Sequence, residues 1–163
     1  MNTDKTLAHI AQLIEDPAYN TQSTLDQICV FLQENYTHYD WVGFYFRNGV
    51  KEELKLKSFA GEPTDHTIIP FGKGICGQVA VSNENFVVPD VKAQDNYIAC
   101  SINVKSEIVI PLFVDQENIG QIDIDSQLVN PFTKEDENLL SKINQQVADF
   151  LKKEKALPIF PSN

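Results

Sequence analysis

The fold is decided by the stretch EIVIPLFV at residues 107–114, followed by the polar turn DQE at 115–117 and by NIGQIDID at 118–125. Both apolar runs are rich in Ile and Val, which favour β-strands. A polar turn between two such runs predicts an antiparallel pair of strands. Counting outward from the turn places Glu107–Ile110 beside Asp123–Asp125, so the strand ends that lie away from the turn meet.

Further strands and helices are predicted on both sides of this pair. Strand-forming runs cover 41–46, 54–58, 67–70 and 86–90, with an Asn-Gly turn at 48–49 and a short helix at 75–81. Apolar residues at helical spacing predict helices within 1–38, and a capping-box pattern at 133–136 opens a helix over 133–154. The prediction is therefore an α+β fold, in which one antiparallel sheet of six strands carries the terminal helices on one face.

Composition and charge exclude several classes of protein. The 163 residues, 42% of them hydrophobic, suit one globular domain with a proper core. The net charge of −10 argues against binding to nucleic acid or to anionic membranes, because both need clustered basic residues. No apolar run reaches the roughly 18 residues of a membrane span, and the amino terminus lacks a signal-peptide layout, so we expect a cytoplasmic protein.

The three cysteines, Cys29, Cys76 and Cys100, form neither a disulfide scaffold nor a metal motif. Their number is odd, no CxxC occurs, and the histidines do not stand at ligand spacing from them. We therefore expect no metal site and reduced thiols. Cys29 lies on the apolar stripe of a predicted helix, and we expect it to be a small buried core residue.

Three acidic residues stand out around the central strand pair. Asp123 and Asp125 are two apart on a strand, so their side chains project from the same face. Glu107 heads the neighbouring strand, seven residues after Cys100. These residues are either solvated strand ends or a cluster beside the thiol. Such a cluster suits an ammonium group or a protonated carboxyl that donates a hydrogen bond, and next to a thiol it indicates redox or nucleophilic chemistry.

Several blocks match a known family in order and spacing. They are Trp41-x3-Tyr45, GKGICG at 72–77, NYIAC at 96–100, SEIVIPL at 106–112 and IGQIDIDS at 119–126. The chain resembles the free methionine-R-sulfoxide reductases, which are single-domain GAF proteins. The IAC and DIDS blocks together make the resemblance specific, and it runs from about Trp41 to the last helix. It implies a single GAF domain over 1–163 that reduces free L-methionine-R-sulfoxide.

The resemblance also implies a role for each matching residue. Cys100 is the attacking thiol, and Cys76 takes part in thiol exchange. The substrate pocket is formed by the carboxylates of Glu107, Asp123 and Asp125 and by an aromatic wall of Trp41 and Tyr45.

The mechanism that follows is sulfenic acid chemistry on Cys100. A protonated carboxyl, from the Asp123/Asp125 pair, protonates the departing oxygen, while Glu107 and the remaining carboxylate hold the substrate's α-amino group. No cofactor is implied, because a thioredoxin-like reductant regenerates the enzyme. The family further implies a homodimer.

One position departs from the family pattern. Family members often carry a resolving cysteine about ten residues before the loop cysteine, where this chain has His66. Cys76 then resolves the oxidised Cys100, an external thiol reduces it directly, or turnover is slow and the pocket serves for binding. The rival interpretation from another class is a non-catalytic GAF sensor of a small molecule.

Overall fold

The structure, a computed structural model, describes residues 2–94 and 103–159. Its helices are α1 (Thr3–Glu15), α2 (Thr21–Asn35), α3 (Gly74–Ser82) and α4 (Lys134–Lys153), with a short 3-10 turn, η1, at Val91–Ala93. Its strands are β1 (Trp41–Arg47), β2 (Glu53–Ala60), β3 (Ile68–Pro70), β4 (Phe86–Val88), β5 (Ser106–Val114) and β6 (Glu117–Ser126). Each of the predicted helices and strands is present, with ends shifted by a few residues at most. Within the described ranges, no helix has the length and apolarity needed to cross a lipid bilayer.

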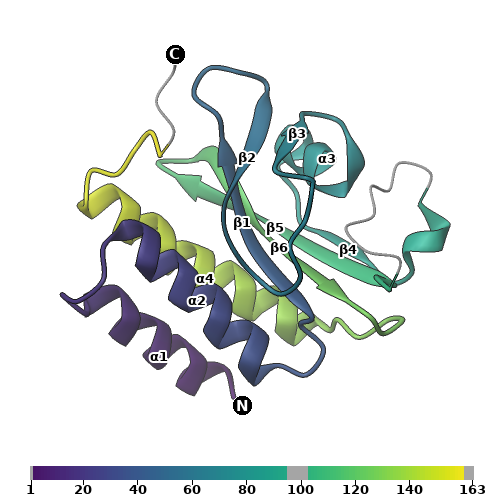
Figure 1. Ribbon diagram of the computed structural model, residues 1–163, viewed down its shortest axis with the longest axis horizontal. Helices are drawn as coiled ribbons and strands as arrows, with labels where there is room; N and C mark the ends of the chain where they lie inside the picture. Colours follow the sequence, from purple (N-terminus) through teal and green to yellow (C-terminus); the bar gives the residue numbers. More distant parts are fainter. Residues whose placement is uncertain (1, 95–102, 160–163) are drawn as a thin grey trace.

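All six strands form one antiparallel sheet in the order β3-β2-β1-β6-β5-β4. Helices α2 and α4 lie across one face of the sheet, with α1 outside them, and α3 lies on the opposite side (Figure 1). The α+β prediction with terminal helices on one face is therefore confirmed. The apolar side chains accordingly form two clusters, a large one between the sheet and the terminal helices and a smaller one beneath α3.

The N-terminus of α4 is fixed by the capping box that the sequence predicts. The hydroxyl of Thr133 accepts from the N–H of Asp136, and the carboxylate of Asp136 accepts from the N–H of Thr133. The same carboxylate accepts from the Tyr39 hydroxyl at 2.6 Å and lies 2.9 Å from His38 Nε2. Asp136 therefore ties the segment between α2 and β1 to the start of α4, close to the outer helix layer.

The central hairpin has the predicted register, but its turn is shorter than predicted and a bulge follows it. The turn holds two residues, Asp115 and Gln116, both with positive φ, and Glu117 already belongs to β6 rather than to the turn. A bulge then follows, because Phe113 pairs with Asn118 whereas Leu112 pairs with Gly120. The extra residue in β6 compensates for the shorter turn. Glu107 consequently lies opposite Asp125, as a three-residue turn predicts.

Strand β4 covers only part of β5. It pairs with residues 107–109, so beyond Val109 no described strand pairs with that side of β5. Pro111, which has no N–H, stands in this uncovered part. The amide of Asn144 in α4 donates to the carbonyl oxygens of Ile110 and Pro111 at 2.9 and 3.0 Å. In this part of β5, the Asn144 side chain supplies hydrogen bonds to the strand, whereas at residues 107–109 strand β4 supplies them.

Candidate active site

The face of the sheet under α3 carries the acidic residues that the sequence singles out. Across β1, β6 and β5, one row holds Trp41, Asp125 and Glu107, and the next row has Asp123 opposite Gly43. Residues that pair across strands project from the same face, so these side chains share one surface. Glu107 is 5% exposed, and Asp123 and Asp125 are each 1% exposed. The interpretation of these carboxylates as solvated strand ends is therefore wrong.

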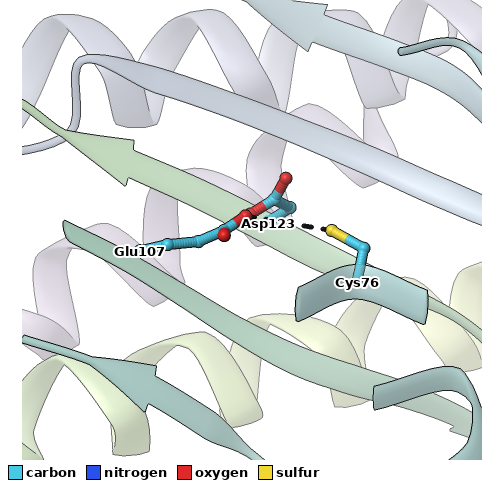
Figure 2. Close-up of side chains that lie close together, drawn as sticks. All are labelled: Cys76, Glu107 and Asp123. Carbon is cyan, nitrogen blue, oxygen red and sulfur yellow. Dashed lines mark hydrogen bonds between the residues drawn. The ribbon is translucent and has the colours of Figure 1, made fainter. Parts of the chain in front are cut away.

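Helix α3 brings Cys76 onto this surface from above. The Cys76 thiol donates to Glu107 Oε2 over 3.9 Å, and ligand atoms of Cys76, Glu107 and Asp123 all lie within 4.8 Å of one another (Figure 2). Gly77 permits this close approach, because a Cβ there would stand 2.6 Å from the carbonyl oxygen of Pro70. The Gly72 N–H donates to the Gly77 carbonyl at 2.8 Å and further fixes the turn before α3.

Glu107 and Asp123 form a hydrogen-bonded pair of carboxyl groups. Burial raises the pKa of Asp123, and the hydrogen bonds from Glu107 and Cys76 offset that rise only in part. A hydrogen bond between two carboxyl groups requires that one of them carries the proton. The pair therefore holds a proton more readily than a solvated carboxylate does. The sequence predicts a like-charge pair of Asp123 and Asp125, whereas the geometry joins Asp123 to Glu107.

Cys76 is a protonated thiol in this environment. Burial raises its pKa well above the ordinary thiol value, and the negative charges of Asp123 and Glu107 raise it further. Its position in the first turn of α3 places it near the positive end of the helix dipole, which lowers a thiol pKa. Desolvation and the two carboxyl groups outweigh that effect, so Cys76 can donate a proton but is a weak nucleophile at rest.

The two aromatic residues of β1 lie on the same face. The ring of Trp41 extends over Gly43, stacks on Phe59 and donates from Nε1 to the carbonyl oxygen of Glu62 at 3.0 Å. The rings of Trp41 and Tyr45 are 6.3 Å apart. The Tyr45 hydroxyl donates to the carbonyl oxygen of His66 at 2.8 Å, which ties the loop before β3 to the sheet.

The predicted residues divide between two depressions that share no lining residue. A small pocket of about 10 Å³ is lined by Tyr45, His66, Cys76, Glu107 and Asp123, among others. A larger cavity of about 420 Å³ is lined by Trp41, Asp125, Asp40, Glu62 and Gln127, among others. The small pocket holds the thiol and the proton-sharing carboxyls, and the larger one combines an aromatic wall with three acidic residues.

Of the remaining cysteines and His66, only Cys29 and His66 lie within the described residues. Cys100 falls within residues 95–102, outside the described residues, so its role as the attacking thiol stays a prediction. Cys29 lies in α2 and is fully buried, and burial raises the pKa of its thiol to about 12, which confirms it as a core residue. His66 is half-buried and lines the small pocket beside Cys76.

Sequence reasoning missed Gly43 and Asp40. A glycine inside a strand commonly marks the close approach of another group, and here that group is the Trp41 ring. Asp40 accepts from the N–H of Gln127 at 2.7 Å and thereby holds the end of β6 against the start of β1. Its position one residue before the strand gave no sign of that contact.

Comparison with known proteins places this geometry in a family. A GAF domain model matches residues 20–151. A free methionine-R-sulfoxide reductase of Escherichia coli is 36% identical over 129 residues, which cover 79% of this chain and 76% of that protein. The structure of the free methionine-R-sulfoxide reductase from Neisseria meningitidis in complex with its substrate has a TM-score of 0.87 and 33% identity, over 94% of this chain and 90% of that one. The type II free methionine-R-sulfoxide reductase from Thermoplasma acidophilum has a TM-score of 0.77 and 40% identity, over 82% and 93% of the chains.

The chain belongs to the free methionine-R-sulfoxide reductase family of GAF proteins. The resemblance seen in the sequence is thereby confirmed. In this reductase, the residues that match the GAF domain model begin at Asn20, the N-cap of α2, and end in α4. It therefore includes the whole sheet, α3 and the carboxyl cluster, whereas α1 precedes it.

Proposed function

We propose that this protein reduces free L-methionine-R-sulfoxide to L-methionine. The observation that carries the proposal is the buried thiol next to a proton-sharing pair of carboxyl groups, in a chain related to proteins named for this activity. A reductase of this kind needs a nucleophilic thiol, a proton for the departing oxygen and a second thiol. Glu107 and Asp123 would supply the proton, and Cys76 would be the second thiol.

In the proposed first step, the thiolate of Cys100 attacks the sulfoxide sulfur. The carboxyl proton shared by Glu107 and Asp123 passes to the sulfoxide oxygen, the S–O bond breaks, and methionine leaves. Cys100 gains the oxygen as a sulfenic acid, while the substrate sulfur is reduced. We assign the proton to the Glu107–Asp123 pair rather than to Asp123–Asp125, because Asp123 is hydrogen-bonded to Glu107.

In the second step, Cys76 condenses with the Cys100 sulfenic acid. A disulfide forms, and water leaves with the oxygen and the thiol proton. The thiol of Cys76 must lose its proton at this stage, and the Glu107–Asp123 pair, which has just given up its own proton, accepts it and passes it to the departing hydroxide. Solvent then restores the proton of the carboxyl pair. The same carboxyls thus act first as an acid and then as a base. A thioredoxin-like reductant then opens the disulfide and restores both thiols.

Substrate recognition is assigned to the larger cavity. Its volume of about 420 Å³ falls within the usual range for small-molecule sites. The acidic side chains, with Asp125 innermost, would attract the α-ammonium group of a free amino acid, and the Trp41 wall would contact the methyl group. A methionine within a polypeptide has no such ammonium group, which explains a preference for the free amino acid.

We further propose that the protein works as a homodimer in the reducing cytoplasm, as part of the response to oxidative stress. The sulfoxide is a product of methionine oxidation, and the mechanism starts from reduced thiols, which the cytoplasm maintains. Light scattering of the purified protein at several concentrations tests the dimer.

The activity is tested by incubating the purified protein with each epimer of free methionine sulfoxide and dithiothreitol, and then quantifying methionine. We expect turnover of the R-epimer only, and loss of turnover in Cys100→Ser. In Cys76→Ser, turnover with dithiothreitol should persist and turnover with thioredoxin should fall, because dithiothreitol can reduce the sulfenic acid directly. A folded protein that turns over neither epimer would contradict the proposal and favour a non-catalytic GAF sensor.

A further inference from the structure

The cluster of Cys76, Glu107 and Asp123 also has the composition of a metal site. The three side chains come from α3, β5 and β6, and each offers one ligand atom within 4.8 Å of the other two (Figure 2). All three are buried. Asp123 supplies a second, independent observation: its Oδ1 is buried and has no hydrogen-bond partner within the described part of the chain. A buried carboxylate oxygen without a partner is costly unless a cation or a proton occupies the space beside it.

We propose that Cys76, Glu107 and Asp123 bind one thiophilic divalent cation, of which Zn²⁺ is the prototype. One sulfur and two carboxylate oxygens form a set of three protein ligands and leave a fourth tetrahedral position open. The adjoining pocket of about 10 Å³ is close to the space of a single water molecule, so an ion with one further small ligand fits and a larger group does not.

The donor set decides which ions are suitable. A thiolate selects zinc-like ions over Mg²⁺ and Ca²⁺, which prefer six or more oxygen ligands. A divalent ion would displace the thiol proton and the proton that the carboxyl groups share, and the buried cluster would keep a charge of −1. Binding should therefore release protons and weaken as pH falls.

Metal binding would compete with the chemistry proposed above. The ion would occupy the sulfur of Cys76 and the carboxyl pair together, so it would remove both the second thiol and the proton donor. Inhibition by Zn²⁺ that a chelator reverses is therefore expected, and this consequence alone rests on the proposed function. Binding itself is measured without substrate, so a failure of the metal proposal and a failure of the reductase proposal are distinguishable.

The test titrates the reduced, metal-free full-length protein with Co²⁺ and follows the sulfur-to-metal charge-transfer absorption in the near ultraviolet. We expect one equivalent of Co²⁺ to produce the band and one equivalent of Zn²⁺ to abolish it. Cys76→Ser should lose the band, and Asp123→Asn should weaken binding by at least about tenfold. Circular dichroism establishes that each variant is folded.

Two matched cysteine variants serve as controls. Cys29→Ala removes a thiol from the opposite side of the sheet, and Cys100→Ser removes the predicted nucleophile. Both should retain the band. No band in the folded wild-type protein, a band that survives Cys76→Ser, a band lost in Cys100→Ser, or unchanged affinity in Asp123→Asn would each overturn the proposed ligand set.

Discussion

The contact between Trp41 and Gly43 shows how one missing side chain shapes the candidate site. An ideal Cβ at Gly43 would stand 2.3 Å from Cη2 of the indole, closer than real Cβ contacts come. The indole of Trp41 can occupy this position only because residue 43, two residues further along the strand, has no side chain. Gly43 lies opposite Asp123, so the ring also borders the acidic cluster.

We expect Gly43→Ala to displace the indole and to destabilise the fold by about 1–3 kcal/mol, as overpacking usually does. Trp41 is the only tryptophan, so its emission reports on this displacement directly. Gly120→Ala is the matched control, because its Cβ would stand 2.3 Å from the Tyr45 carbonyl oxygen instead of the indole. Equal emission changes in both folded variants would contradict the local explanation.

The carboxyl groups around Cys76 should control its reactivity. Desolvation raises the pKa of the thiol, and the charges of Asp123 and then of Glu107 add to it. Asp123→Asn removes one of these charges, so the thiol pKa should fall and alkylation at neutral pH should accelerate. Rates of iodoacetamide labelling against pH, in a Cys100→Ser background, measure this effect. Asp125→Asn should change the rate less, because Asp125 contributes least.

At the level of single elements, the start of α4 carries a pH-dependent contribution to stability. Burial raises the pKa of Asp136, but hydrogen bonds from Tyr39, Thr133 and His38 outweigh it, so the net pKa lies below the ordinary value of 3.8. A carboxyl with a lowered folded pKa stabilises the protein above its unfolded pKa. That contribution is lost as pH falls below about 4 and through the folded pKa.

We expect Asp136→Asn to reduce the free energy of unfolding by about 1–3 kcal/mol at pH 7. The loss should be smaller at pH 3, where the wild-type carboxylate is being protonated. Urea unfolding at both pH values measures the difference. Glu135→Gln, an exposed neighbour in the same helical turn, should leave stability nearly unchanged; a similar loss there would assign the effect to overall charge.

The strands and their register could be predicted from the sequence, whereas the packing of α3 over the sheet could not. Alternation and turn residues predicted the strands, and counting outward from the turn correctly placed Glu107–Ile110 beside Asp123–Asp125. The turn itself was predicted wrongly, and the bulge in β6 compensates for that error. The proximity of Cys76 to Glu107 was beyond prediction, because 31 residues separate them and the approach depends on how α3 packs over the sheet.

At the scale of the whole molecule, the sheet separates the stabilising core from the candidate site. The helix-side cluster includes Leu140 and Ile143, whereas Cys76, Trp41 and Tyr45 belong to the cluster under α3. The motifs of the sequence fall mainly on the second face, and the apolar residues at helical spacing pack on the first.

We therefore expect Leu140→Ala to lower the free energy of unfolding by about 2–5 kcal/mol while leaving the site unchanged. Denaturant unfolding gives the stability, and the labelling rate of Cys76 under native conditions reports on the site. A folded Leu140→Ala protein in which Cys76 reacts at an altered rate would show that the two faces are coupled.

The uncovered part of β5 has a consequence for how copies of the molecule meet. An open strand edge can pair with another chain and begin aggregation. Pro111 offers no N–H there, and Asn144 already occupies the carbonyl oxygens of Ile110 and Pro111. We expect Pro111→Val to form insoluble assemblies faster than the wild-type protein at equal stability, measured by light scattering during mild heating. The proline within this strand would then protect the protein from aggregation and would not be a defect in the sheet.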